Sequence, residues 1–460
     1  MPADTPPSDT LRSDALTIWR AGLDAVDARR LVREAFRRCD GRLEISGHPV
    51  DLRETGRLCV VGAGKAGGAM AAGLEEALEG HDLFERIEGW VNVPENCVRP
   101  LQRITLHGAR PAARNEPTQD GVRGSLRILD LVADLRAEDV CIVLLSGGGS
   151  ALLPAPCEGV SLEDKLAVTQ FLSRRGATIQ ELNCVRKQLS RIKGGGLIRS
   201  CNAGLTIVLI ISDVIGDPLQ SIASGPTVPN LETAGDALQV LTRCESPDDP
   251  APPAVRLFLE RKAGEPPADP ADIPSTVHNH VIGNNRLAVE AAAAEARRLG
   301  YHVPDPVSDV AGVARDIGES LAMECVAVRG DPSIVKDGVA LISGGEPVVH
   351  LVKTKGPQKG GRNQELVLAA VNQLWDDGMA GIVILSGGTD GEDGPTDAAG
   401  AVADAELIER GREAGIIPSE FLEVNNSYPF FDATDGLIRT GPTETNVMDL
   451  RVSLVSAPSV

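Results

Sequence analysis

Aromatic residues and positive charge are both scarce in this chain of 460 residues. It contains three Trp, two Tyr and seven Phe, and its 45 Lys and Arg stand against 65 Asp and Glu, a formal net charge of −20. Proteins that bind nucleic acids need a basic surface and commonly offer aromatic rings for stacking. The composition therefore excludes nucleic acid as the expected partner and favours small polar molecules.

Long apolar runs and paired cysteines are missing as well. No run approaches the roughly 18 apolar residues of a membrane-spanning helix, and the opening segment MPADTPPSDT has no apolar signal-peptide core and no arginine. The nine cysteines are scattered and form no C-x-x-C pair, which disfavours a disulfide framework and a structural zinc site. We therefore predict a cytoplasmic protein with no membrane partner.

Short apolar runs that end in glycine-rich turns recur along the chain and predict strands. These runs lie at 58–61, 140–145, 205–211, 339–342 and 382–385. Stretches with helical periodicity stand between them, and such alternation is typical of an α/β fold with mainly parallel sheets flanked by helices.

A stretch rich in proline and acidic residues divides the chain. The length suggests two or three domains. We predict an N-terminal α/β domain over 12–245, a surface linker over 246–275 with one short helix, and a C-terminal α/β domain over 276–457.

Ser-Gly-Gly follows three of the apolar runs, at Ser146, Ser343 and Ser386, and Gly62-Ala-Gly64-Lys65 follows another. A tight turn that needs positive φ would explain any single one of them. Turns of this kind also expose backbone N–H groups, and ligands of open α/β sheets bind at the carboxyl ends of strands. Together the four turns favour an anion-binding site, with Lys65 as a point charge.

A basic island occupies residues 171–200, with seven Lys and Arg against one Glu. A solvated helix face is the usual explanation of such a run. In a chain of net charge −20, however, an island of net +6 beside the glycines 194–196 would focus an anionic substrate. We predict that Arg186 and Lys187 bind the substrate and that Asn183 orients one of its hydroxyls.

Carboxylates gather in the glycine-rich segment 382–404, which has no basic residue. Asp390, Asp393 and Asp397 are candidate Mg²⁺ ligands, because Mg²⁺ needs only one or two carboxylates besides phosphate oxygens. An acidic surface loop is the alternative. Asp213, at the end of an apolar run, is a candidate general base, metal ligand or helix cap.

Arg362 lies in the segment GGRNQE (360–365), just where a helix is predicted to begin. The helix dipole disfavours a cation at that end. We expect an anion between Arg362 and the helix N-terminus to resolve this conflict.

Taken together, these segments resemble the class II glycerate kinase family, whose C-terminal module is called MOFRL. The matching segments run in order from about residue 12 to 452 and include VVGAGKAG (60–67), LSGGGSALL (145–153), RGATIQELN (175–183), KGGG (193–196), SDVIGD (212–217), ASGPT (223–227), SGGE (343–346), GGRNQE (360–365), SGGTDG (386–391) and TNVMD (445–449). Two departures are the stretch Gly108-Ala-Arg110-Pro111-Ala-Ala, where the family often has Gly-His-Pro-x-Pro-Asp, and Glu444, where it usually has Gly.

The resemblance implies two α/β domains that enclose an interdomain cleft, with the MOFRL module over about 338–450. It implies transfer of a phosphoryl group from ATP to the 2-hydroxyl of D-glycerate, giving 2-phosphoglycerate and ADP, with Mg²⁺. Lys65 and Arg362 correspond to the residues proposed for the family's active site, and we assign Asp213 as the base that accepts the hydroxyl proton.

We assign the remaining predicted contacts by ligand. Glycerate would be bound by Arg186, Lys187, Asn183, Ser146 and Ser150. ATP would be bound by Gly62, Gly64, Gly147, Gly148, Gly149, Gly194, Gly195, Gly387, Gly388, Thr389 and Asp390.

Two other functions stay open at this point. The spacing Gly62-x-Gly64-x-x-Gly67 fits a dinucleotide fingerprint and would suit an NAD(P)H-dependent hydroxypyruvate reductase, although the acidic residue expected about 20 positions later is missing. A non-catalytic protein that binds nucleotides or sugar acids is the other. The sequence leaves the oligomeric state open, with a homodimer as one alternative.

Overall fold

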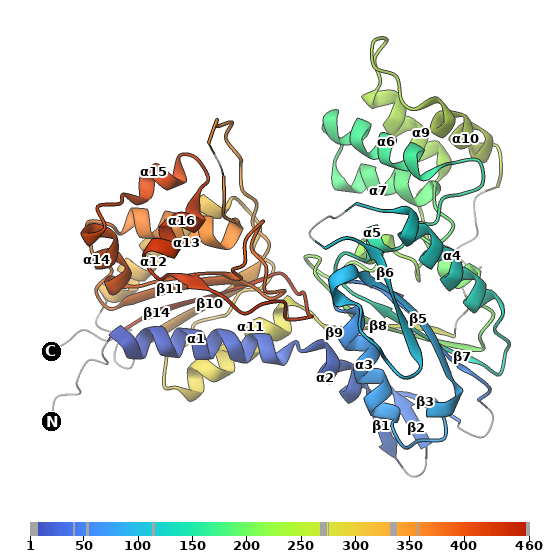
Figure 1. The fold of residues 1–460 in the computed structure, drawn as a ribbon, viewed down its shortest axis with the longest axis horizontal. Helices are drawn as coiled ribbons and strands as arrows, with labels where there is room; N and C mark the ends of the chain where they lie inside the picture. Colours follow the sequence, from blue (N-terminus) through green and yellow to red (C-terminus); the bar gives the residue numbers. More distant parts are fainter. Residues whose placement is uncertain are drawn as a thin grey trace. The chain divides into compact units, whose positions relative to one another are not determined.

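The structure is a computed structural model of the chain (Figure 1), and it describes residues 8–39, 42–51, 55–112, 116–266, 274, 276–331, 338–356 and 358–456. The chain forms two compact units. Unit 1 combines the described residues up to Asp27 with those from Gly283 onward, and unit 2 runs from Ala28 to Ile282.

This division differs from the predicted domains in three places. The first is residues 276–282, which were predicted in the C-terminal domain but belong to unit 2. Helix α1 (Ser8–Ala25) belongs to unit 1, because Leu11, Ile18 and Trp19 fill the core of that unit. The segment predicted as a linker contains α10 (Pro253–Ala263), which packs in a core of unit 2 through Val255 and Leu259. Residues 267–273 and 275 of the predicted linker lie outside the described residues.

The main sheet of unit 2 has six strands in the order β6-β5-β4-β7-β8-β9. They are β4 (Leu58–Ala63), β5 (Ile87–Pro94), β6 (Ile104–Arg110), β7 (Val140–Leu145), β8 (Leu205–Ile211) and β9 (Val277–Gly283). The pairs β4–β5, β5–β6, β4–β7 and β7–β8 are all parallel, as predicted. Every residue of β4 and of β7 is buried, which explains why these strands are continuous apolar runs in the sequence.

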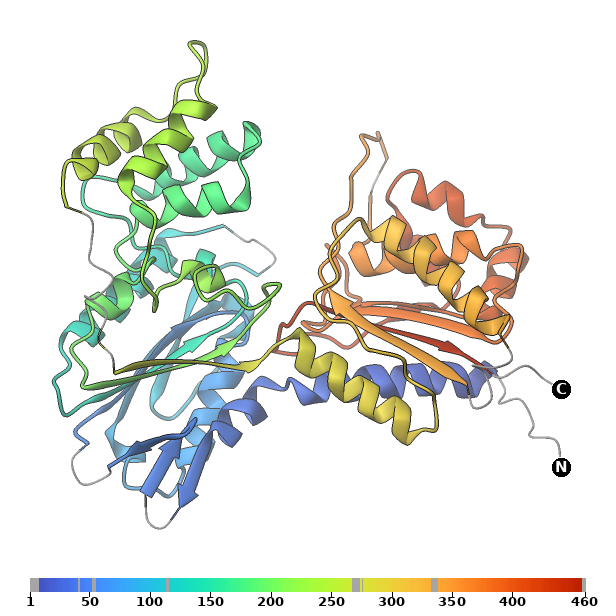
Figure 2. The same ribbon diagram turned by 180° about the vertical axis from the view of Figure 1, so that it is seen from behind.

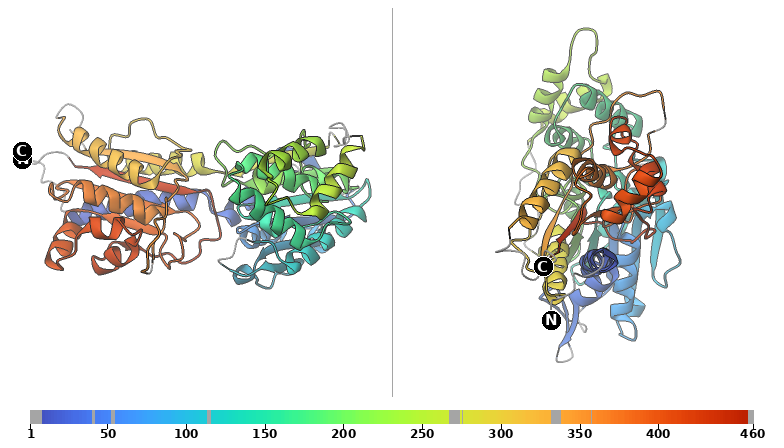
Figure 3. Two further views of the ribbon diagram at one scale, coloured as in Figure 1. Left: turned by 90° about the horizontal axis from the view of Figure 1, so that it is seen from above. Right: turned by 90° about the vertical axis from the view of Figure 1, so that its left-hand side faces the viewer.

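The helices of unit 2 fall into two groups. Five of them are α2 (Ala28–Ala35), α3 (Gly67–Leu78), α4 (Gln119–Ala133) and the short α5 (Gly149–Leu152) and α8 (Gly196–Arg199). The others are α6 (Leu162–Arg174), α7 (Ile179–Gln188), α9 (Ala234–Cys244) and α10, which share a separate apolar core. Figures 1 and 3 show these four helices gathered as one group.

The sheet of unit 1 has five strands in the order β10-β14-β11-β12-β13. They are β10 (Val339–Gly345), β11 (Ile382–Gly388), β12 (Gly400–Ala403), β13 (Leu437–Ile438) and β14 (Asp449–Val455). All of its pairs are antiparallel, so the parallel pairing expected for both sheets holds in unit 2 only. The reason is β14, which lies between β10 and β11 and runs opposite to both of them.

Helices cover both faces of this sheet, as predicted. On one face α1 and α11 (Asn285–Arg298) pack in one apolar core; on the other, α12 (Ala314–Arg329), α13 (Arg362–Gln373), α14 (Ala405–Glu413), α15 (Pro418–Leu422) and α16 (Ser427–Ala433) share a second. Figure 2 shows α11 and α12 on opposite sides of the strands. No helix within the described ranges is both long and apolar enough to cross a membrane.

Three histidines connect a small sheet to the main sheet of unit 2. The small sheet consists of β1 (Phe36–Cys39), β2 (Arg42–Ile45) and β3 (His48–Val50). The ring of His48 stacks on that of His278 with centroids 3.8 Å apart and lies 5.0 Å from that of His280. Burial and the neighbouring His278 lower the pKa of His48, an effect that Glu44 partly offsets, and burial with the other two rings lowers the pKa of His280.

Acidification from about pH 7.5 to about pH 5.5 should therefore destabilise unit 2, and His48→Gln should weaken this pH dependence. Because the folded pKa values lie below the ordinary value, the unfolded chain binds protons that the folded chain does not. The stability is fully present above the ordinary histidine pKa and is lost as the pH falls through the lowered values. Thermal unfolding across this range measures the effect. The matched control is His350→Gln, because His350 is exposed. If the melting temperature of His48→Gln changed with pH as much as that of the wild type, the explanation would be wrong.

Candidate functional site

The carboxyl ends of β4, β7 and β8 lie side by side in unit 2. Ala63 pairs with Leu145, and Leu145 pairs with Ile210. The loops that follow these strands, beginning at Gly64, Ser146 and Ser212, therefore start at one edge of the sheet. Lys65, the Ser146 turn and Asp213 therefore all follow strands that end at this edge.

The Lys65 loop and the Ser146 turn are locked to each other. The Lys65 N–H donates to the Gly147 carbonyl (2.8 Å), and the Ala66 N–H donates to Ser146 Oγ (3.0 Å). Ser146 is thus a buried positioning residue of this pair of turns.

Glycine is required where the two turns meet. Gly64 has φ +152°, and a Cβ there would lie 2.8 Å from the Ser146 backbone nitrogen. Gly148 has φ +76° and caps the N-terminus of α5. A Cβ on Gly148 would meet Lys65 Cγ at 3.5 Å and Arg110 Nη2 at 3.4 Å, so two cationic side chains pass close to this turn.

Ser150 contacts two cations of the basic island. Its Oγ accepts hydrogen bonds from Arg186 Nη2 (2.7 Å) and from Lys193 Nζ (2.8 Å), and it lies 2.8 Å from Ser224 Oγ. Asn183 Oδ1 accepts a longer bond from Arg186 Nη1 (3.4 Å). Three predicted substrate contacts, Ser150, Arg186 and Asn183, are therefore neighbours.

The cations at this place are desolvated. Burial lowers the pKa of Arg186, and it lowers the pKa of Lys193 well below its ordinary value, with Arg186 and Lys165 as further causes. The ammonium of Lys165, bonded to the Leu189 carbonyl at 3.0 Å, has its pKa lowered to about 7 by burial. Within the described ranges neither Arg186 nor Lys193 has a carboxylate as ion-pair partner.

Lys187 does not join this cluster. Its Nζ lies 3.2 Å from Glu232 Oε2, and that carboxylate neutralises it. Consecutive residues of a helix point in directions about 100° apart, so Lys187 does not share the orientation of Arg186 on α7, and its contact with the substrate stays a prediction. The second cation that contacts Ser150 is Lys193, which follows the end of that helix.

The N–H groups of several glycines predicted to bind ATP are already used. Gly194 and Gly195 donate to the carbonyls of Ser224 (3.1 Å) and Gly225 (2.7 Å). In unit 1, the Gly388 N–H donates to Ala399 and the Thr389 N–H to Met448, at 2.8 and 3.0 Å. Gly387 is an interior residue of the β11 ladder.

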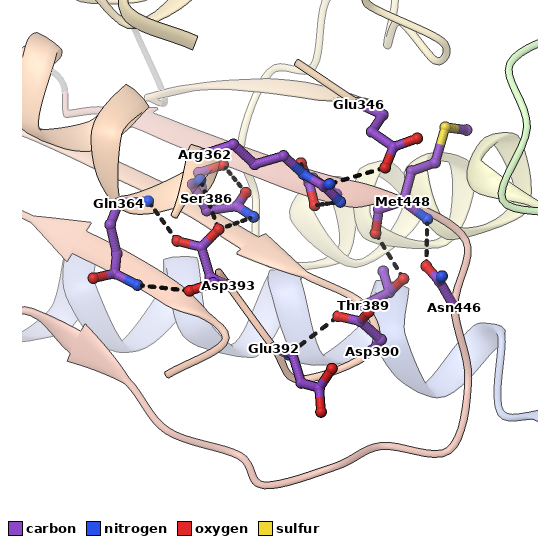
Figure 4. A network of polar contacts seen from close by, with 12 residues as sticks. Glu346, Arg362, Gln364, Ser386, Thr389, Asp390, Glu392, Asp393, Asn446 and Met448 are labelled. Carbon is purple, nitrogen blue, oxygen red and sulfur yellow. Dashed lines mark hydrogen bonds and ion pairs between the residues drawn. The ribbon is translucent and has the colours of Figure 1, made fainter. Parts of the chain in front are cut away.

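A second cluster surrounds Arg362 at the start of α13 in unit 1 (Figure 4). Arg362 donates from Nε and Nη2 to the two carboxylate oxygens of Asp449 (2.7 and 3.0 Å) and from Nη1 to Glu346 Oε1 (2.8 Å). Asp449 is fully buried, because it begins β14 between Gly345 of β10 and Gly388 of β11. Burial lowers the pKa of Arg362, but the nearby carboxylates of Asp449 and Glu346 together raise it by more. The pKa therefore lies above its ordinary value.

The anion expected between Arg362 and the helix N-terminus is supplied by the chain itself. Asp393 Oδ1 and Oδ2 accept the backbone N–H bonds of Asn363 (3.0 Å) and Gln364 (2.9 Å), which caps α13. Arg362 meanwhile turns toward Asp449 and Glu346. Asp393 thus binds the helix N-terminus, while Asp449 and Glu346 bind the guanidinium. Together these carboxylates resolve the conflict with the helix dipole that the sequence presented.

The three carboxylates predicted as metal ligands have different surroundings. Asp393 is committed to capping α13, and Asp397 accepts from the Tyr428 hydroxyl (2.7 Å) and Arg439 Nε (3.1 Å). Asp390 Oδ1 accepts from the Glu392 N–H (3.1 Å) and lies beside Asp449 at Gly388. In the part of the chain that the structure describes, no preformed group of three or more His, Cys, Asp or Glu could hold a metal ion.

Sequence reasoning missed several residues of these clusters. Ser224 and Lys193 lie in the segments ASGPT and KGGG, where only Gly194 and Gly195 had been given a role, and Asp449 closes the polar segment TNVMD. Glu444 has φ +58°, in the left-handed region that favours glycine, the residue that the family resemblance leads us to expect there. Arg110, in the other departing stretch, is buried beside Gly148, while Ala113 of that stretch lies outside the described residues.

Two family models match the chain. "Domain of unknown function (DUF4147)" matches residues 14–260 and "MOFRL family" matches residues 339–449.

Named relatives and a solved structure cover nearly the whole length. A "Glycerate 2-kinase" of Pyrococcus horikoshii is 36% identical and the match spans 97% of this chain and 98% of that protein. A "Putative hydroxypyruvate reductase" of Agrobacterium vitis is 40% identical over 87% of this chain and 100% of that protein. The crystal structure of a glycerate kinase from Thermotoga maritima matches with a TM-score of 0.81 and 33% identity, covering 97% of this chain and 100% of that one.

Proposed function

Because the chain belongs to the glycerate kinase family of DUF4147 and MOFRL proteins, we propose that it transfers a phosphoryl group from ATP to the 2-hydroxyl of D-glycerate, giving 2-phosphoglycerate and ADP. Glycerate and the 2-position come from the names of the relatives, and ATP as the donor follows from the kinase reaction of the family. Phosphoryl transfer needs the acceptor hydroxyl to be held close to the phosphoryl group, and it needs cationic groups that neutralise the charge on that group.

The observation that carries this proposal is the carboxyl edge of the unit 2 sheet. Lys65 and the Ser146 turn are hydrogen-bonded to each other there. Ser150, in the helix that follows this turn, accepts hydrogen bonds from Arg186 and Lys193. Buried positive charge without a carboxylate partner suits a ligand that brings negative charge with it. Glycerate and ATP are both such ligands.

Each predicted catalytic residue has a role in this reaction. Lys65 would neutralise charge on the transferring phosphoryl group, and Asp213, at the end of β8, would accept the hydroxyl proton. Arg362 would supply a second cation through the part of its guanidinium that Glu346 and Asp449 leave accessible, since its side chain is 31% exposed.

The metal implied by kinase chemistry fits the donor set only in part. Mg²⁺ supplies charge neutralisation on phosphate oxygens when bound. Of the three predicted ligands, we propose Asp390 as the one that would hold the ion; it follows β11 and its Oδ1 accepts from the Glu392 N–H. Asp393 and Asp397 are committed to the contacts described above.

A hydroxypyruvate reductase is the second candidate, because one relative carries that name and Gly62-x-Gly64-x-x-Gly67 follows β4. A dinucleotide site needs an acidic residue at the end of the next strand. Here β5 ends in Val93-Pro94, and the exposed Glu95 begins a separate 3-10 turn.

One set of parallel assays separates these functions. Purified protein is incubated with ATP, Mg²⁺ and D-glycerate, and the product is compared by ³¹P NMR with 2- and 3-phosphoglycerate. The proposal expects the 2-phosphate and ADP in equal amounts. NADH oxidation with hydroxypyruvate but no phosphorylation would establish the reductase instead, and binding of both ligands without turnover would indicate a non-catalytic protein.

A further inference from the structure

We propose that Lys193, together with Arg186, Ser150 and Ser224, forms the subsite that binds the carboxylate group of the acceptor acid. This inference rests on the proposed function, which it extends by naming the chemical group that the enzyme selects. It replaces Lys187, which the sequence had suggested, by a lysine on a different element.

The subsite is built by four segments of unit 2 that hold one another in place, one of them the 3-10 turn Ile222–Ser224. Ser150 lies in α5, Arg186 lies in the last turn of α7, and Lys193 precedes α8. Lys193 Nζ donates to the Ser150 carbonyl and to Ser150 Oγ, both at 2.8 Å, and lies 3.4 Å from Ser224 Oγ. Since one ammonium contacts both serines, their positions are fixed relative to each other.

The backbone around Ser224 is held in an uncommon conformation. Ala223 and Ser224 have φ values of +50° and +64°, although neither is glycine. The N–H groups of Gly194 and Gly195 bond to the carbonyls of Ser224 and Gly225, so the Lys193 turn clamps this segment directly. Strained residues that the surroundings hold in place cluster at ligand sites, and here the strain presents the Ser224 hydroxyl to Lys193 and Ser150.

The charge balance of the island indicates a missing anion. Three of its other cations pair with carboxylates of the chain: Lys187 with Glu232, and Arg174 and Arg175 with Asp249. Lys193, only 3% exposed, and Arg186 have hydroxyl, amide and carbonyl oxygens as their hydrogen-bond partners. Buried charges are normally paired, because desolvation costs several kcal/mol per ion. A ligand carboxylate would complete the site.

The hydroxyls make a carboxylate a better fit than a neutral group. Ser150 Oγ already accepts from two cations, so its own hydrogen is available to Ser224 or to a ligand oxygen. A carboxylate oxygen can accept from both cations and from a hydroxyl, and charge-assisted bonds of this kind are the strong ones. An acceptor without a carboxylate would leave the two cations uncompensated and should be rejected.

The test replaces the ammonium by a neutral side chain of similar length. Lys193→Met should raise the KM for D-glycerate about 30-fold or more, as expected when one partner of a buried charge contact is lost, while the KM for ATP stays within about twofold. Ser224→Ala should raise the same KM by a smaller factor. Arg174→Gln is the matched control, because Arg174 belongs to the same island but is 67% exposed and pairs with Asp249.

A binding measurement without ATP keeps the inference separate from the kinase activity. D-glycerate should raise the melting temperature of the wild type and of Arg174→Gln but not of Lys193→Met. Glycerol should raise none of them, and inorganic phosphate shows whether any small anion suffices.

The outcomes are distinguishable. If the wild type phosphorylates glycerate while Lys193→Met and Ser224→Ala keep its KM within about threefold, the subsite is wrong and the proposed function stands. If the wild type has no kinase activity but glycerate still stabilises it through Lys193, the proposed function fails and the subsite stands. Stabilisation by inorganic phosphate but not by glycerate would overturn the assignment to a carboxylate.

Discussion

Replacing Arg362 by alanine should lower the free energy of unfolding of unit 1 by about 3 kcal/mol. The guanidinium binds both oxygens of Asp449, a carboxylate with 0% exposure, and also reaches Glu346. Removing it leaves a buried negative charge without its bidentate partner, and such losses belong to the largest effects of single substitutions. Arg451, also buried on β14, is near enough for its charge to interact with Asp449 and would compensate only in part.

Denaturant unfolding of Arg362→Ala, Asp449→Asn and the double variant measures this effect. We expect the double variant to be less destabilised than the sum of the single ones, since the second change removes the charge that the first leaves unpaired. Arg286→Ala is the control: its i,i+4 pair with Glu290 is exposed and should contribute below about 1 kcal/mol. A loss no larger than that for Arg362→Ala would contradict the structural role.

The same geometry affects how activity data on Arg362 must be interpreted. Arg362→Lys keeps the charge but not the planar fork that binds Asp449 at two atoms. A loss of kcat in Arg362→Ala therefore combines a missing cation with a disturbed junction of α13 and β14. Only activity measured on protein shown to be folded separates the two contributions.

Strands were predictable from the sequence because their signal is local. The apolar runs 140–145 and 205–211 correspond to β7 and β8 residue for residue, and 58–61 lies within β4. Buried parallel strands are continuous apolar runs bounded by turns, so the signal for β7 and β8 did not depend on distant contacts.

The pairing of β14 could not be predicted in this way. Its polar residues Asp449, Arg451 and Ser453 alternate with apolar ones, which is typical of a strand with one face in water, yet the whole strand is buried. Its insertion between β10 and β11 depends on contacts across more than sixty residues of sequence. The placement of α1 in unit 1 has the same origin, since Trp19 packs against Gly387.

The same contrast between local signals and distant contacts applies to the candidate site. Ser150 and Arg186 were predictable because each lies in a glycine-rich or basic motif whose chemistry is visible locally. Choosing Lys193 over Lys187 required the end of α7 at Gln188 and the turn through Gly194 and Gly195, both with positive φ, which directs the following chain back to Ser224. Orientation of this kind is set by tertiary structure.

Lys65→Ala should lower kcat/KM for phosphorylation of D-glycerate by roughly 10²–10³, the usual loss when one donor to developing charge is removed. Lys65 is fixed at its backbone, where its N–H bonds to the Gly147 carbonyl, and its side chain passes the Gly148 turn. The charge is therefore held in position before the substrates arrive, and its loss cannot be compensated by a rotation of the loop. Most of the reduction should be in kcat, because charge on the phosphoryl group is stabilised mainly in the transition state.

The fold should survive this substitution, which makes the kinetic loss specific. Lys65 is only partly buried, and the bonds that lock its loop to the Ser146 turn come from backbone N–H groups that alanine retains. The melting temperature should therefore change little, as it should for the control Arg127→Ala, whose side chain is 50% exposed. Lys65→Arg should recover part of the activity, because it restores a charge in a different shape. Activity of Lys65→Ala within tenfold of the wild type would remove Lys65 from this role and would leave Arg186 and Lys193, the cations that contact Ser150, as the candidates for it.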